Sequence, residues 1–545
     1  PSGRIGIRTG RWTLTASGSG SFTPVAESRF TETREQAGQP LPFAGRSDSK
    51  SRTNYGRGHF SAVFDPTPKH TAGFDIEYTE RSTHMPTLSR TTLGQTQSDS
   101  RYRQHMDGNT LTATANYIWK IDTLGSQFKL IADYTRYTSD GDNSYHTTTC
   151  APGTLRDSLY ESATGSVYDI LTADAGLTRK LPHGLTLRAG LRYTRNDMAD
   201  KSRYAAQTQG TWLALPEYSY DQHYTEQIGA AYASLEYSAG RWELSAGLRG
   251  EYTSVASQAF GRSYFGLFPN VSVSRALNAL RTWLLVAQWS RNIERPAFPA
   301  LNPARIRISD YSWQSGNPSL RPTYIHRFSL TAVWKYRYTL TVGGNLHHDL
   351  IREIAHRDAT APDAVYIRPE NHYTENHWFV AASVPAKITR WWNLSVNAVG
   401  VMQRIRLNST DSPATHYLMF ADATCSFTLP AGFFAEAVYR AQSRLYSGNS
   451  EVGPRHTLSA TVKKQLFGKR LTLFCTLSNI TGCDWEFASL TDGMRRTIDT
   501  RQAWSGRLWK VGAAWNFRTG KKFRARTVES AAETQRKRLV KSTEQ

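Results

Sequence analysis

Alternation of apolar and polar residues over long segments is the feature that most constrains the fold of this chain. Residues 241–252, RWELSAGLRGEY, place Trp242, Leu244, Ala246 and Leu248 on one face, with polar or charged residues between the first three. Successive side chains of a β-strand point to opposite faces, so this segment predicts a strand with one apolar and one polar face. The same period of two recurs in residues 126–134, 183–194, 392–399 and 470–479.

The length of these segments and the character of their polar face distinguish a membrane barrel from a soluble sandwich. Many segments run for twelve or more residues, whereas strands of globular proteins centre near about five or six. Their polar face is often charged, with small residues between the charges, as expected for a water-filled lumen. The sequence has no uninterrupted apolar run near the roughly 18 residues that a membrane helix needs. We therefore predict an all-β fold, a large antiparallel transmembrane β-barrel.

The connections between the predicted strands alternate between short turns and long polar links. Short turns are predicted around Thr9-Gly10, 65–70, Gly125, Pro182–Gly184, Ala239-Gly240, Asn278, Lys335–Arg337, Arg390, Pro430–Gly432 and Gly468-Lys469. Long extracellular loops are predicted at 23–54, 81–107, 139–165, 197–222, 293–323, 353–371 and 483–500. Short turns at one end and long loops at the other are typical of bacterial outer-membrane barrels, which predicts the outer membrane as the location.

Counting strands from the turns gives twenty-one, the last of them in residues 501–517. Bacterial single-chain barrels have even strand numbers, so we expect one further strand upstream of Pro1 and a total of about 22. A lumen of that width cannot be filled by strand side chains alone, so we also expect a plug domain upstream. Residues 1–517 are assigned to the barrel, and the basic tail, 518–545, is expected to be a disordered periplasmic extension.

A proline-rich stretch interrupts the alternation between two predicted strands. It contains SRNIERPAFPALNP, residues 290–303, and YSWQSGNPSLRP, residues 311–322. Proline removes a backbone donor and restricts the residue before it, so this stretch predicts a shaped extracellular loop. Asn302-Pro303 and Gly316-Asn317-Pro318 are expected to supply turns, and Arg291 and Arg295 to hydrogen-bond loop carbonyl groups. Alternatively, Tyr311 and Trp313 contact a ligand through their rings.

These two segments resemble the S-R-x-I-x-R-P…L-N-P…G-N-P-x-L-x-P pattern of TonB-dependent receptors, closest to the outer-membrane β-barrel family of the Bacteroidetes type. In the pattern they carry Arg291, Arg295, Pro296, Asn302, Pro303, Gly316, Asn317 and Pro318. The resemblance implies a transporter that imports a scarce nutrient, such as a ferric chelate, a glycan or a peptide. It also implies periplasmic TonB as the partner that supplies energy. We find neither a plug nor a TonB box in the 545 residues, and we expect both in an upstream part.

Composition and motifs weigh on the remaining functions. The net charge is +21, which fits contact with lipopolysaccharide phosphates or a lumen that recruits an anionic ligand. No nucleic-acid motif accompanies the charge, and no nucleophile, metal-ligand or phosphate-loop motif predicts an enzyme or a cofactor. His347 and His348 are adjacent, so a strand directs them to opposite faces. The alternative to a transporter is a passive outer-membrane pore or a surface scaffold or adhesin barrel.

Cysteines and tryptophans give two further predictions. Cys150 and Cys483 lie in predicted loops and could pair, whereas Cys425 and Cys475 lie in predicted strands. Tryptophans near strand ends are expected to form the aromatic girdle of a barrel at the membrane interface. This set is Trp119, Trp242, Trp283, Trp334, Trp391, Trp392 and Trp515.

Overall fold

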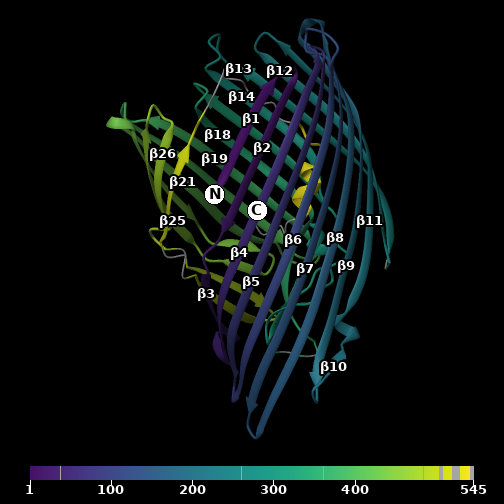
Figure 1. Cartoon of the computed structure of the whole chain (residues 1–545), viewed down its shortest axis with the longest axis vertical. Helices are drawn as coiled ribbons and strands as arrows, with labels where there is room; N and C mark the ends of the chain where they lie inside the picture. Colours follow the sequence, from purple (N-terminus) through teal and green to yellow (C-terminus); the bar gives the residue numbers. More distant parts are fainter. Residues whose placement is uncertain are drawn as a thin grey trace.

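The computed structural model describes residues 1–36, 38–258, 260–359, 361, 363–482, 484–502, 507–517 and 528–539. In this described part, 29 strands form one sheet that curls into a barrel (Figure 1). Twenty-one of them follow one another around the wall: β1 (Ser2–Thr9), β2 (Trp12–Phe22), β4 (Gln39–Thr67), β5 (His70–Leu93), β6 (Thr96–Lys120), β7 (Gln127–Ala151), β8 (Thr154–Leu181), β9 (Leu185–Thr208), β11 (Tyr220–Ala239), β12 (Trp242–Ser257), β13 (Gly261–Ala276), β14 (Trp283–Glu294), β17 (Thr323–Trp334), β18 (Tyr338–Arg357), β19 (Val365–Lys387), β20 (Trp392–Arg406), β21 (Ala414–Leu429), β22 (Phe433–Gln442), β25 (Arg455–Leu466), β26 (Leu471–Ser478) and β29 (Leu508–Trp515). The predicted fold class and strand count are confirmed for these residues.

Shorter elements complete the structure. The remaining strands are β3 (Ala26–Gln36), β10 (Thr211–Ala214), β15 (Ile306–Ser309), β16 (Ser312–Gln314), β23 (Leu445–Ser447), β24 (Ser450–Val452), β27 (Trp485–Thr491) and β28 (Met494–Gln502). The helices are α1 (Phe298–Leu301), α2 (Glu533–Arg536) and the 3-10 turns η1 (Pro182–Gly184), η2 (Pro216–Tyr218), η3 (Pro430–Gly432) and η4 (Lys537–Leu539). No helix in the described part is long and apolar enough to cross a membrane.

The two ends of the barrel differ as the sequence predicts. All ten predicted short turns join consecutive wall strands, and they lie at one end, which we assign to the periplasm. The other end carries the long hairpins of β4 to β9, which reach far beyond the rest of the wall (Figure 1). This end is therefore the extracellular one.

Most of the predicted extracellular loops are largely strand. The links predicted at 23–54, 81–107, 139–165 and 197–222 continue the wall strands, so that β6 and β7 pair from Lys120↔Gln127 to Gln97↔Cys150. Outside the membrane both faces of a strand meet water, and the apolar alternation that marks a strand disappears. Backbone pairing continues there because Thr and Tyr favour extended structure. The predicted extracellular loops at these positions are therefore long β-hairpins.

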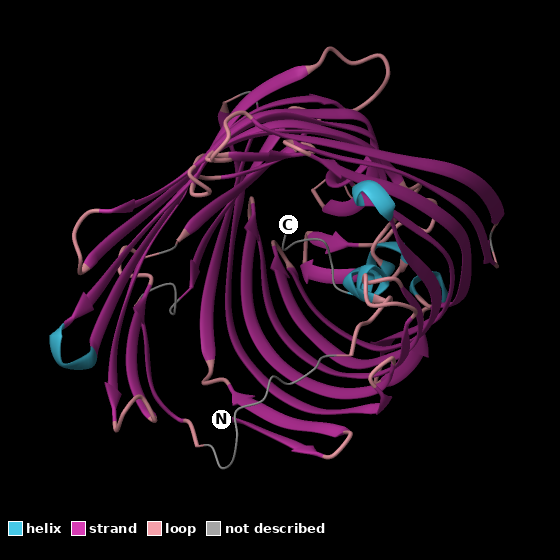
Figure 2. Ribbon diagram, turned by 90° about the horizontal axis from the view of Figure 1, so that it is seen from above, coloured by secondary structure: helices cyan, strands magenta, loops and turns pink. Residues whose placement is uncertain are grey.

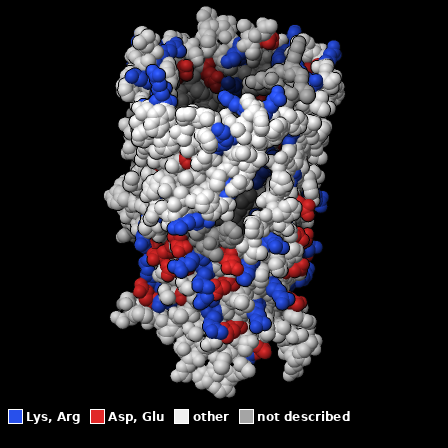
Figure 3. Space-filling view, turned by 60° about the vertical axis from the view of Figure 1, so that its left-hand side comes forward, with Lys and Arg blue, Asp and Glu red and all other residues white. Residues whose placement is uncertain are grey.

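Within the membrane part of the wall, the apolar face points outward. On β12, Leu248 is 50% exposed on the outside, whereas Thr253 is 0% exposed on the inside. Figure 3 shows the result on one side of the molecule: a belt with few charged side chains lies between the periplasmic rim and a lower half rich in Lys, Arg, Asp and Glu. The belt is the surface that contacts the hydrocarbon of the membrane.

The predicted tryptophan girdle is confirmed at the periplasmic end. The tryptophans predicted for it all lie at, or next to, a short turn or at the end of β29. Trp283 and Trp334 are paired across neighbouring strands, with ring centroids 5.7 Å apart. Cys425 and Cys475 lie in β21 and β26, and Cys150 is exposed and free. Cys483 lies outside the described residues, so its predicted pairing with Cys150 stays a prediction.

The first and last wall strands, β1 and β29, are not paired with each other in the described residues. Within the described residues, β1 pairs only with β2 and β29 pairs only with β26, which leaves a seam between β1 and β29. On the extracellular side, β28 pairs with β3, from Met494↔Gln36 to Gln502↔Ser28. On the extracellular side β24, β27, β28, β3 and β4 are therefore paired in this order, whereas the seam between β1 and β29 stays unpaired in the described residues.

The described part of the C-terminal tail, residues 528–539, differs from the predicted disordered extension. It enters the lumen, where α2 and η4 lie inside the ring of strands (Figure 2). The amide of Ala531 donates to Asp133 on the inner face of β7, at 2.7 Å, and Arg538 is ion-paired with Glu226 on β11. Charge explains the difference: the tail is basic, and the inner wall presents carboxylates that the sequence pattern alone does not gather.

Candidate functional site

The proline-rich loop, which connects β14 to β17, folds into the lumen. Its short helix α1 places Phe298 and Leu301, 1% and 2% exposed, against apolar side chains on the inner face of the wall. Leu320, further along the loop, is also fully buried in this cluster. The wall residues of the cluster are Tyr168, Ile170, Met198, Tyr224 and Val255. Apolar residues on the polar side of these strands are thus explained by the loop that covers them.

Two turns of the loop are joined through backbone hydrogen bonds. The Gly316 amide donates to the Asn302 carbonyl at 2.9 Å, and the Asn317 amide donates to the Ala300 carbonyl at 2.7 Å. The Asn302 side-chain oxygen accepts from the Tyr220 hydroxyl of β11 at 2.6 Å. A Cβ atom on Gly316 would lie 2.1 Å from the Asn302 carbonyl oxygen, so only glycine fits. Pro303 and Pro318 follow these two asparagines, as the predicted turns require.

The two arginines of the loop segment have partners other than those predicted. Arg295 is 8% exposed at its side chain and donates to Glu251 at 2.7 Å and to Thr253 at 2.8 Å, with Glu226 3.9 Å away. Arg291 donates to the carbonyl of Leu267 in β13 at 3.0 Å. Arg295 thus fixes the loop entrance to wall carboxylates, and Arg291 binds a strand carbonyl. The predicted bonds to carbonyl groups of the loop itself were wrong.

The β15–β16 hairpin of the same loop packs against the extracellular hairpins. Asp310 at its tip accepts from the Tyr102 hydroxyl at 2.8 Å and from Ser100 at 2.6 Å, and it is ion-paired with Arg307. The Arg307 guanidinium lies 5.6 Å from the ring centroid of Tyr160 and 5.9 Å from those of Tyr102 and Tyr145. This contact closes part of the extracellular mouth from the inside.

Tyr311 and Trp313, the residues considered for ligand contact, are both half-buried in this hairpin. The Tyr311 carbonyl accepts from the Val365 amide at 2.9 Å, and burial raises the pKa of its hydroxyl. The guanidinium of Arg305 lies over the Trp313 ring, 4.2 Å from the ring centroid. Both side chains contribute to the packing of the hairpin, and their contact with a ligand stays a prediction.

A buried charge cluster connects this hairpin to the β3–β28 pair. Glu32 accepts from Arg34 and from Arg496, each at 2.8 Å, and Arg496 also donates to Ser312 of β16 at 3.1 Å. Arg34 continues to the carbonyl of Asp363. Burial acts to raise the pKa of Glu32, but the two arginines outweigh burial and hold the pKa below its ordinary value. The cluster therefore joins three extracellular segments through one ionised carboxylate.

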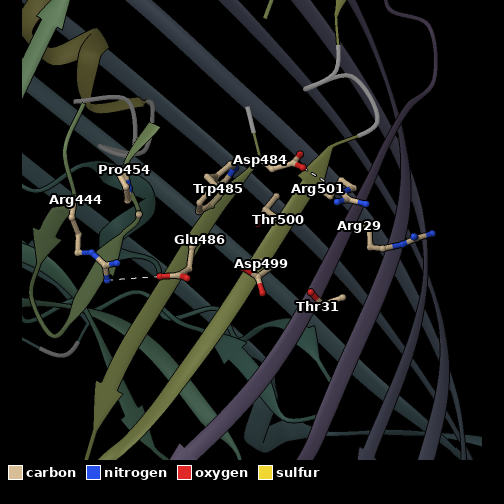
Figure 4. A pocket seen from close by; sticks show the side chains of 11 residues that line it. Arg29, Thr31, Arg444, Pro454, Asp484, Trp485, Glu486, Asp499, Thr500 and Arg501 are labelled. Atoms are coloured by element: carbon tan, nitrogen blue, oxygen red, sulfur yellow. Dashed lines mark hydrogen bonds and ion pairs between the residues drawn. The ribbon is translucent and has the colours of Figure 1, made fainter. Parts of the chain in front are cut away.

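A groove lies on the extracellular part, along the β3–β28 pair, where Arg29, Thr31, Asp499 and Arg501 alternate with the residues of the charge cluster (Figure 4). It encloses a volume of about 610 Å³ and is lined by Arg29, Thr31, Arg444, Gly453, Pro454, Asp484, Trp485, Glu486, Asp499, Thr500 and Arg501. Arg501 faces Asp484 at 3.3 Å, and Arg444 faces Glu486 at 3.8 Å. Charges of both signs beside an indole suit a polar ligand with an apolar part.

Sequence reasoning missed this groove because its lining comes from four separate segments. Two of the predicted long links gave a signal. The link at 23–54 contributes Arg29 and Thr31, and the link at 483–500 contributes Asp484, Trp485, Glu486, Asp499 and Thr500. His347 and His348 behave as predicted: His347 is 9% exposed toward the lumen, and the His348 side chain is 58% exposed on the other face. In the described residues, no group of three or more His, Cys, Asp or Glu side chains is arranged to hold a metal ion.

The fold and its inward loops define an outer-membrane β-barrel with an occupied lumen. The chain belongs to the outer membrane protein beta-barrel family, whose model matches residues 119–515. The predicted location in the outer membrane is therefore confirmed. No curated protein sequence matches the chain.

Solved structures with a similar fold are remote in sequence. The copper transporter OprC is 11% identical, with 88% of this chain and 81% of that chain covered and a TM-score of 0.54. The FpvAI–pyocin S2 complex is 10% identical, with 88% and 70% covered and a TM-score of 0.52. The ferric-catecholate import receptor Fiu from E. coli K12 is 8% identical, with 88% and 82% covered and a TM-score of 0.51. At these identities the similarity shows the fold.

Proposed function

We propose that this chain is the barrel of a TonB-dependent outer-membrane transporter that imports a scarce nutrient. The observation that carries the proposal is the inward folding of the proline-rich loop, which is fixed to the wall by Arg295 and covered by the β15–β16 hairpin. A passive pore needs an open path, whereas the proline-rich loop and the tail segment occupy part of this lumen (Figure 2). Two barrels of similar fold are a copper transporter and a ferric-catecholate import receptor, which supports import.

The proposed substrate class is a ferric chelate, a glycan or a peptide that enters at the extracellular mouth. The groove beside Trp485 offers three arginines and three carboxylates, and a ligand of any of these kinds carries matching polar groups. Tyr311 and Trp313 lie behind the mouth and are weaker candidates for contact. The proposal assigns no catalytic reaction, cofactor or nucleic acid to the chain.

The proposed partners follow from the seam and the charged surface. Among the described residues no strand pairs with the outer edges of β1 and β29, and a strand from an upstream segment fits between them. A plug domain and a TonB box in the same upstream segment would couple the barrel to periplasmic TonB. The charged half of the surface below the apolar belt suits lipopolysaccharide phosphates (Figure 3). The Bacteroidetes-type membership remains part of this proposal.

Competition between cells tests the transport function without a known ligand. Cells with and without the protein are grown together with limiting iron, copper, glycan or peptide, each in backgrounds with and without TonB. We expect the protein to confer an advantage under at least one limitation, and only where TonB is present. An advantage that persists without TonB indicates a passive pore. No growth advantage under any limitation, together with weaker surface adhesion of the cells that lack the protein, indicates a scaffold or adhesin.

A further inference from the structure

The C-terminal segment, residues 528–539, makes specific contacts along the inner wall. The Lys129 ammonium of β7 lies 2.6 Å from the Glu529 carboxylate, and Asp133, four residues further along the same face of β7, accepts from the Ala531 amide. Val528 packs beside Gly73 on β5, where an added Cβ would lie 2.9 Å from its methyl group. These contacts place the start of the segment against the inner faces of β5 and β7.

Arg538 makes the deepest contacts of the segment. Its guanidinium is ion-paired with Glu226 of the wall and donates from Nε to the Pro296 carbonyl of the proline-rich loop at 3.0 Å. The same guanidinium lies over the ring of Phe298, 4.3 Å from its centroid. Arg538 therefore touches the wall and the loop at the same time, and its side chain is only 7% exposed.

The neighbouring residue shows that the contact is selective. Lys537 precedes Arg538 and carries the same charge, but its side chain is 73% exposed and pairs only locally with Glu533 at 3.0 Å. Ala532 is fully buried, and Leu539 packs on the apolar cluster that holds α1. The segment thus presents one face to the wall and the loop and the other to the open lumen.

We propose that residues 528–539 form a lumenal latch that holds the proline-rich loop in its inward position through Arg538. The latch and the loop share Glu226 as an anchor, because Arg295 approaches the same carboxylate from the loop side at 3.9 Å. Removal of Arg538 leaves this buried carboxylate with Arg295 and Asn196 and takes away the bond to Pro296. The loop near α1 then opens more often. This inference stands apart from the identity of the imported nutrient.

The position of the latch is tested by zero-length cross-linking of the unmodified protein in outer-membrane vesicles. A carbodiimide activates the Glu529 carboxylate, and the Lys129 amine displaces the activated group to form an amide, with the carbodiimide released as its urea. We expect mass spectrometry to find the joined peptides of β7 and the tail. The Glu529→Gln variant should lose this product. Absence of the product from the unmodified protein overturns the proposal.

The role of the latch is tested by hydrogen exchange of the loop amides near 296–305. We expect Arg538→Glu to accelerate hydrogen exchange of these loop amides by at least about tenfold. In this variant the loop can open locally without first breaking the contacts of Arg538. The matched control is Lys537→Glu, which should stay within about twofold of the unmodified protein because Lys537 is exposed.

A second variant, truncated after Phe517, removes the same contacts and keeps the test decisive if the Arg538→Glu variant misfolds. Its barrel retains β29, and the folded state is checked by its heat-dependent mobility on gels. We expect the truncation to accelerate loop exchange as Arg538→Glu does, while exchange in β20 and β21 stays unchanged. Equal loop exchange in the unmodified, truncated and Arg538→Glu proteins contradicts the latch.

Discussion

Arg295 illustrates how single residues stabilise the interior of this barrel. Its guanidinium lies between the buried carboxylates Glu251 and Glu226, and each of the three side chains is less than one-tenth exposed. The sequence marks Arg295 as part of a motif, but it does not reveal the two carboxylates, which lie on β11 and β12 and meet Arg295 only in the fold. Partners across a barrel are fixed by strand order and register, and neither is visible in a local pattern.

We expect Arg295→Met to destabilise the folded barrel by about 3–5 kcal/mol, because Glu251 loses its most buried counter-charge and Glu226 keeps only Arg538. Urea unfolding in detergent, followed by the heat-dependent gel mobility, measures the change. The control is Arg321→Ala: Arg321 pairs with Asp349 at 2.7 Å, but its side chain is 62% exposed, so its loss should cost less than about 1 kcal/mol. Equal effects of the two substitutions would exclude a special role for the buried arginine.

Gly316 is the residue at which the predicted turn is most strictly required. A Cβ atom there would meet the Asn302 and Ala300 carbonyl oxygens at 2.1 and 2.8 Å, and backbone atoms cannot rotate away. We expect Gly316→Ala to cost roughly 1–3 kcal/mol and to expose the loop to limited proteolysis. Gly400→Ala is the control, since nothing lies within 4 Å of its added methyl group. A Gly316→Ala protein as resistant to protease as Gly400→Ala would contradict the turn geometry.

At the scale of elements, sequence patterns predict the part of each strand that lies in the membrane, but they do not predict its extracellular continuation. The strand predicted in 241–252 coincides with the first part of β12 (Trp242–Ser257), because lipid on one side and water on the other impose the alternation, and the last five residues of β12 were missed. The extracellular halves of β5 to β9 meet water on both faces, so they lack the alternation of apolar and polar residues. The β3–β28 pair joins residues that are more than 450 positions apart, so no local pattern could predict it.

The β3–β28 pair should depend on pH through Glu32. Because its pKa in the folded protein lies below the ordinary value of 4.5, ionised Glu32 stabilises the pair above that pH, and the contribution is lost as the pH falls through the folded pKa. We expect hydrogen-exchange protection factors of 26–36 and 494–502 to fall between about pH 6 and about pH 3. Glu32→Gln should reduce protection at the higher pH and flatten this dependence.

Glu27 provides the control on the same strand. Its carboxylate is 3.2 Å from Lys50, but both side chains are more than half exposed. Glu27→Gln should therefore leave the protection of the β3–β28 pair and its pH dependence unchanged. A pH dependence in Glu32→Gln as steep as in the unmodified protein would assign the effect to another group.

At the scale of the whole molecule, the seam between β1 and β29 is the feature that most needs a partner. We expect the outward-edge amides of β1 to exchange freely in the 545-residue chain and to be protected at alternate positions in the native protein, where an added antiparallel strand would bond every second residue. Hydrogen exchange of residues 2–9, measured on both forms, tests this. Equal exchange in the two forms would mean that no strand fills the seam.

The central claim, that this barrel belongs to an energised importer, is tested most directly by the intact mass and N-terminal sequence of the protein purified from native outer membranes. The account predicts a chain heavier by about 15 kDa or more, the size of a small plug domain, with a plug-sized stretch upstream of Pro1. A mature protein that begins at Pro1 would lack plug, TonB box and closing strand together, and would contradict the account.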